Sequence, residues 1–90
     1  MPAVALHTLQ RAELALGALR ASADVVASTI ERGLAADERQ LALAVLGSTQ
    51  VMADVITQCM TDPLASSGSD FMDLLDRALD ASKRIEEVFQ

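Results

Sequence analysis

Aromatic residues, cysteine and lysine are all scarce in this chain of 90 residues, which has two Phe, no Trp, no Tyr and one Cys. A single cysteine cannot form a disulfide within the chain, so the reducing cytoplasm is the expected location. The N-terminal residues 1–7 carry no basic segment ahead of their apolar side chains, as a signal peptide would. The sequence is therefore expected to be a cytoplasmic protein.

Basic residues are too few for a nucleic-acid-binding surface. The formal net charge is −6, and Lys83 and Arg84 are the only adjacent basic pair, whereas affinity for nucleic acid depends on clustered Lys and Arg. A transmembrane helix is not expected either, because residues 41–60, the most apolar stretch, contain several polar side chains. These are Ser48, Thr49, Gln50, Asp54, Thr57 and Gln58. We therefore expect neither nucleic acid nor membrane as a partner.

Residues that carry chemistry are also sparse. The single His7 has no second His or Cys at a metal-ligand spacing, and Cys59 falls on an apolar side of a predicted helix. The sequence contains no glycine-rich phosphate loop, no HExxH and no CxxC. We expect no catalytic residues, no metal and no cofactor.

A small helical enzyme is the minor alternative. Small all-helical chorismate mutases are similar in size and in their three-helix layout, and they hold a dianionic substrate with several inward-pointing Arg and Lys. The arginines of this chain outside its last helix fall on polar helix sides. These arginines are Arg11, Arg20, Arg32 and Arg39, and the one lysine is Lys83. The resemblance is one of architecture, which does not determine activity.

Abundant Ala, Leu and Val, together with two breaks in the pattern, predict an all-α fold. Gly33 is a typical residue after a helix C-terminus, and Asp37 with Gln40 forms a capping-box pattern at the start of the next helix. Asp62-Pro63 ends that helix, and a short polar linker follows over residues 64–69. The prediction is one domain, residues 1–90, with helices at about 3–32, 37–62 and 69–89. We expect a long antiparallel helical hairpin plus a shorter third helix, a three-helix bundle.

The apolar faces of the predicted helices differ in width. The third helix has one apolar face, whereas the second is apolar over most of its circumference and is expected to be the most buried. Such a helix would touch the first and third helices, or one of them and a second copy of the chain. The first helix carries a main apolar stripe and a second, minor stripe. The minor stripe comprises Leu14, Ala18, Ala21 and Val25.

The minor stripe is the sequence-based candidate for a protein interface, which Met72 and Leu79 on the third helix could extend. The alternative interpretation is that a stripe made mostly of alanine is merely exposed. On this basis we expect a small non-enzymatic protein-binding module: an adaptor, co-chaperone, anti-activator or inhibitor. Its partner would be another protein, itself as a homodimer, or both. A self-assembling structural subunit, whose main interface is its own oligomer, is the alternative function.

Overall fold

The computed structural model describes residues 6–66 and 68–89, apart from the side chains of residues 63 and 66. Four helices follow one another in this part of the chain: α1 (Leu6–Arg32), α2 (Ala36–Met60), α3 (Pro63–Ser66) and α4 (Ser69–Phe89). The three long helices pack against each other, which confirms the predicted all-α three-helix bundle. The predicted start of the first helix at residue 3 lies outside the described residues.

The end of α1 is set by glycine, as predicted. Gly33 has a φ of 98°, a conformation that costs glycine little and other residues more. Its amide donates a hydrogen bond to the carbonyl of Ile30, at 3.1 Å. The predicted side-chain cap of α2 is wrong: Ala35 is the N-cap residue, without a side-chain hydrogen bond, and Asp37 lies inside the first turn. There its negative charge still interacts favourably with the helix dipole.

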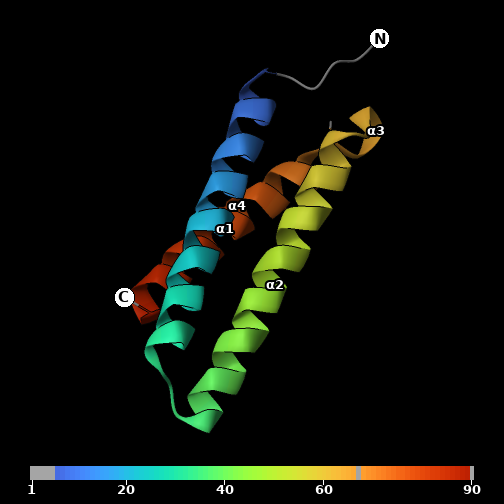
Figure 1. The fold of residues 1–90 in the computed structure, drawn as a ribbon. Helices are drawn as coiled ribbons and strands as arrows, with labels where there is room; N and C mark the ends of the chain where they lie inside the picture. Colours follow the sequence, from blue (N-terminus) through green and yellow to red (C-terminus); the bar gives the residue numbers. More distant parts are fainter. Residues whose placement is uncertain (1–5, 67, 90) are drawn as a thin grey trace.

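The linker between the second and third long helices contains a short helix that the sequence did not predict. Asp62 starts this turn, because its Oδ1 accepts a hydrogen bond from the amide of Leu64 at 3.0 Å. A carboxylate that bonds an amide two residues further on is a common device for starting a turn or a helix. The result is α3, four residues long, which lies between the end of α2 and the start of α4 (Figure 1).

The closest partner of α4 is α1 of the same chain. The Ser22 hydroxyl donates to the carbonyl of Ser82 at 3.1 Å, and the Thr29 hydroxyl donates to that of Phe89 at 3.3 Å. Nearer the start of α1, Arg11 forms an ion pair with Asp76. Because these contacts follow the same order along both helices, α1 and α4 run in the same direction. In Figure 1, α4 begins beside α3, passes behind α1, and ends on the side of α1 away from α2.

The core is built mainly from α1 and α4. Its fully buried cluster comprises Ala12, Ala15, Leu19, Ile56, Phe71, Leu75 and Ala78. Of these, only Ile56 belongs to α2. The predicted apolar face of the third helix is confirmed, since Phe71, Leu75, Ala78 and Ser82 are its buried residues. Small buried side chains along this seam let the backbones of α1 and α4 approach each other closely.

Candidate functional site

The apolar surface of α2 is mostly exposed, so the prediction that the second helix is the most buried is wrong. Its buried residues are Ala42, Thr49 and Ile56 alone, fewer than in α1 or α4. Four large apolar side chains remain accessible: Leu41 at 61%, Leu43 at 48%, Val51 at 63% and Val55 at 42%. The physical reason is the course of α4, which packs along α1 and moves away from α2, so that only one side of α2 is covered.

Three of these four side chains lie on one line along α2, and Leu43 lies on another side of the helix. We call this line the α2 stripe: Leu41, Ala44, Ser48, Val51 and Val55, every one of them exposed. Their spacing alternates between three and four residues, which places them on one side of a helix, as in the seam of a coiled coil. None is charged. The stripe therefore has the pattern that helices use to pack on other helices.

An apolar groove runs beside this stripe, between α2 and α4. Leu19 of α1, Met52 of α2 and Ile85 of α4 line its main part, which has a volume of about 260 Å³. Ala44, Val45, Ser48, Thr49 and Ala81 complete the lining. A second hollow of about 410 Å³ lies against Val51, Met52, Val55 and Leu74. Because all these lining side chains are uncharged, the α2–α4 groove suits an apolar occupant.

Met52 joins the two parts of the α2–α4 groove, because it lines both. Its unbranched side chain can adopt several shapes, which makes methionine useful on surfaces that adapt to a partner. Cys59, one turn beyond Val55, is half-buried and packs against the core cluster. Sequence reasoning missed the groove because the apolar arc of α2 was taken to be a buried one.

The sequence-predicted interface residues lie on another side of the molecule. Leu14 is 60% exposed, and together with Met72 it lines a hollow of about 430 Å³. Arg11 and Asp76 border the same hollow, and the guanidinium Nε of Arg11 donates to the Asp76 carboxylate at 2.8 Å. The structure therefore brings Leu14 and Met72 together, but beside an ion pair rather than on a purely apolar face.

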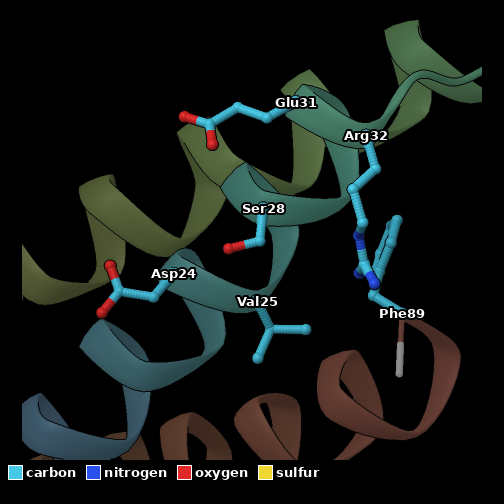
Figure 2. A pocket seen from close by; sticks show the side chains of 6 residues that line it. All are labelled: Asp24, Val25, Ser28, Glu31, Arg32 and Phe89. Carbon is cyan, nitrogen blue, oxygen red and sulfur yellow. The ribbon is translucent and has the colours of Figure 1, made fainter.

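The remaining predicted residues are dispersed. Val25 borders a hollow near the end of α1, together with Asp24, Glu31, Arg32 and Phe89 (Figure 2). Ala18 is half-buried and Ala21 is exposed. Leu79 is partly buried and packs against the core cluster, as Met72 also does. Three of the six residues, Leu14, Met72 and Val25, thus border two separate hollows that contain charged groups, and the role of the six as one interface stays a prediction.

Metal-coordinating groups do not cluster in the part of the chain that the structure describes. No three His, Cys, Asp or Glu side chains among the described residues are placed to hold a metal ion. His7 is exposed and borders the hollow of Leu14. What the α2 stripe and the α2–α4 groove offer a partner is an apolar area shaped to receive a helix.

The helix α2 also meets the length and composition requirements of a membrane-spanning segment. Only 17% of its most apolar 18-residue window is buried in the fold, so it differs from the core helices that commonly pass the same test. Length and composition do not distinguish a lipid-facing helix from one that faces a protein partner.

Comparison with known proteins adds no relative: no protein-family model matches the chain, and no curated protein or solved structure is significantly similar to it. A function must therefore be argued from the surface of the molecule itself. The exposed α2 stripe and the groove next to it are the features on which that argument depends.

Proposed function

We propose that this chain is a small non-enzymatic protein-binding module that accepts a helix in the α2–α4 groove. The observation that carries the proposal is the exposure of Leu41, Val51 and Val55 on one uncharged side of α2. An amphipathic helix that lays its apolar face into such a groove is a recurrent mode of recognition. In this proposal α1 and α2 act as an antiparallel hairpin that presents the groove, as an adaptor, co-chaperone, anti-activator or inhibitor would do.

The surface area of the chain supports an interface. A compact protein of 9.5 kDa exposes about 5,000 Å², whereas this chain exposes 5926 Å². The difference, roughly 900 Å², leaves the chain with accessible surface to spare for a partner even at the small end of interface sizes. Each Å² of apolar surface that a partner covers contributes about 25 cal/mol of favourable free energy.

A protein partner is favoured over lipid because of what lies on the other sides of α2. Asp54 of α2 and Arg20 of α1 line a common hollow between the two helices. Insertion of α2 into a bilayer would bring these charges into hydrocarbon or detach α2 from α1, and either costs several kcal/mol. We therefore propose a cytoplasmic protein with no membrane, nucleic-acid or cofactor partner.

The alternative function is a structural subunit that assembles with copies of itself. The regular spacing of the α2 stripe favours this alternative, because it is also the spacing of a self-associating helix seam. The sequence-predicted surface around Leu14 and Val25 remains a second proposed interface. A pair of variants distinguishes that second surface from the groove, and the identity of the retained chain distinguishes a copy of the same sequence from another protein.

The test is co-purification from the native cell with three forms of the chain: wild type, Val51→Asp and Leu14→Asp. The two substitutions are matched, since each adds a carboxylate to an exposed apolar position, 63% and 60% accessible, on a long helix. We expect a protein chain, of this or another sequence, to be retained by wild type and by Leu14→Asp, and to be lost with Val51→Asp. Loss with Leu14→Asp alone, at unchanged helicity, would move the binding surface to the minor stripe.

A further inference from the structure

The exposed face of α2 is complementary to itself. We infer that its occupant is a second copy of this chain, whose α2 packs antiparallel to the first α2 about a two-fold axis near residues 49 and 50. The inference rests on the proposed function, because it names the partner that covers the same surface. Three observations support it: the order of side-chain sizes along the stripe, the distribution of charge, and the extent of the face.

The sizes of the stripe residues match when one α2 is turned end over end. An axis between residues 49 and 50 places Ala44 opposite Val55 of the second copy, and Ser48 opposite Val51. In these two pairs a small side chain meets a larger one, Leu41 falls opposite the polar Gln58, and two-fold symmetry repeats every contact. The alternating spacing of three and four residues is kept in both directions. Small residues opposite larger ones let two helices pack closely without leaving a cavity.

The distribution of charge permits a second copy at this face of α2. Each chain carries a net charge of −6, so two copies repel one another unless their contact surfaces are neutral. Between residues 40 and 61, Asp54 is the only Asp, Glu, Lys or Arg, and it faces the hollow shared with Arg20 of α1. The α2 stripe is therefore a neutral face on an acidic protein. In the proposed pairing, Asp37 and Asp62 of opposite copies meet at the two ends.

The extent of the face predicts a reversible dimer. The α2 stripe with the turn that follows it, from Leu41 to Cys59, is about 27 Å long, and α2 with the adjoining wall of α4 is about two helix diameters, ~20 Å, wide. This gives on the order of 500 Å² per copy and 1,000 Å² in total, the lower end of specific interfaces. Interfaces of this size are typical of weak, transient complexes, so we expect a dissociation constant in the micromolar range, on the order of 10 µM.

The first experiment measures the mass of the full-length chain by sedimentation equilibrium from about 1 to about 300 µM, a range centred on the expected constant. Wild type and Leu14→Asp should change from monomer to dimer over this range. Val51→Asp, which places two carboxylates in each interface, should weaken association by about 100-fold or more. Added salt should tighten the wild-type dimer a few-fold, because it screens the acidic ends. If the partner carried the opposite charge, added salt would weaken the association instead.

A cross-linking experiment tests the orientation and does not depend on how well Val51→Asp folds. In a Cys59→Ala background, one tagged copy carries Ala44→Cys and a differently tagged copy carries Val55→Cys. A short thiol-specific linker should join these two copies. The control replaces the second copy with one carrying Leu41→Cys, which lies about 20 Å further along the paired helix and should not react. Preferential linkage of identical positions, the mark of a parallel pair, would overturn the inference.

Two further results would also overturn it. In the first, wild type stays monomeric at every concentration, and a different protein co-purifies with wild type but not with Val51→Asp. That result would exclude the second copy as occupant while leaving the proposed function intact. Binding to phospholipid vesicles that is lost with Val51→Asp and kept with Leu14→Asp would assign the same face to a membrane. If wild type is monomeric and Val51→Asp changes neither co-purification nor vesicle binding, the inference and the proposed function both fail.

Discussion

The two sides of α1 are covered in different ways, and the contrast explains how a chain this small both folds and keeps a surface free. Toward α4, α1 is joined by buried side chains, by hydrogen bonds such as that from Ser22 to Ser82, and by the Arg11–Asp76 ion pair. Toward α2, the buried contribution of the second helix is limited to Ala42, Thr49 and Ile56. The α1–α4 seam therefore holds the fold, while α2 contributes its apolar residues largely to the surface.

The largest expected effect separates the two regions by side-chain truncation. Leu75→Ala on α4 removes a fully buried side chain and should lower the free energy of unfolding by about 3 kcal/mol, through lost burial and the cavity left behind. Leu41→Ala on α2 is the matched control and should change it by less than about 0.5 kcal/mol, because that side chain is already exposed. Urea unfolding of dilute samples measures both. Equal losses would show that α2 is as firmly packed as α4.

A smaller effect tests the hydrogen bonds across the α1–α4 seam. The Ser22 hydroxyl shares its one proton between the carbonyls of Ala18 and Ser82, whereas the Ser82 hydroxyl donates to Ala78 of its own helix. Ser22→Ala should therefore destabilise the chain by about 0.5 kcal/mol more than Ser82→Ala does. Thermal unfolding of the two variants provides the measurement. Equal stabilities would mean that the hydroxyl of Ser22 does not join the helices.

An effect no larger than this concerns the ion pair near the start of the seam. The side chains of Arg11 and Asp76 are 42% and 55% exposed, so solvent screens most of their attraction. A double-mutant cycle of Arg11→Ala and Asp76→Ala should give a coupling free energy of about 0.5 kcal/mol at low salt. Salt near ~1 M should remove most of it. A coupling that persists at high salt would show a firmer contact than its exposure implies.

Local features of the fold were predictable from the sequence where a few neighbouring residues determine them. Gly33 ends α1 because its backbone adopts a positive φ. The buried face of α4 follows from the spacing of Phe71, Leu75 and Ala78, since a helix with one strong apolar stripe has only one side suited to burial. The ion pair of Asp80 and Arg84, at 3.1 Å, is of the same local kind, because residues four apart on a helix are neighbours.

Features that depend on which helices meet were not predictable in the same way. The apolar arc of α2 could be buried against two neighbours of its own chain or against one neighbour and an outside partner, and the amino-acid pattern is the same in both cases. The path of α4, which follows α1, determines which of these two arrangements occurs. The contact of Arg11 with Asp76, 65 residues apart, results from that same path and has no local signal in the sequence.

The candidate site in the structure differs from the one predicted from the sequence for the same reason. Sequence analysis selected Leu14 as surplus apolar surface, and that side chain is indeed exposed, but the larger surplus is on α2. Val51 and Val55 were assigned to the interior because a wide apolar arc is usually buried. Their exposure, and not their composition, makes them candidates for a partner, and exposure is a property of the folded chain.

The measurement that tests the account most directly is a dilution series of the isotopically labelled full chain followed by amide chemical shifts. From about 300 to about 5 µM, a range that brackets the expected dissociation constant, we predict changes at residues 41–59 of α2 and at the facing wall of α4, near Ala81 and Ile85. The amides around Leu14 should stay constant. Concentration-dependent shifts around Leu14, with constant shifts along α2, would contradict the claim that the exposed face of α2 is the interaction surface.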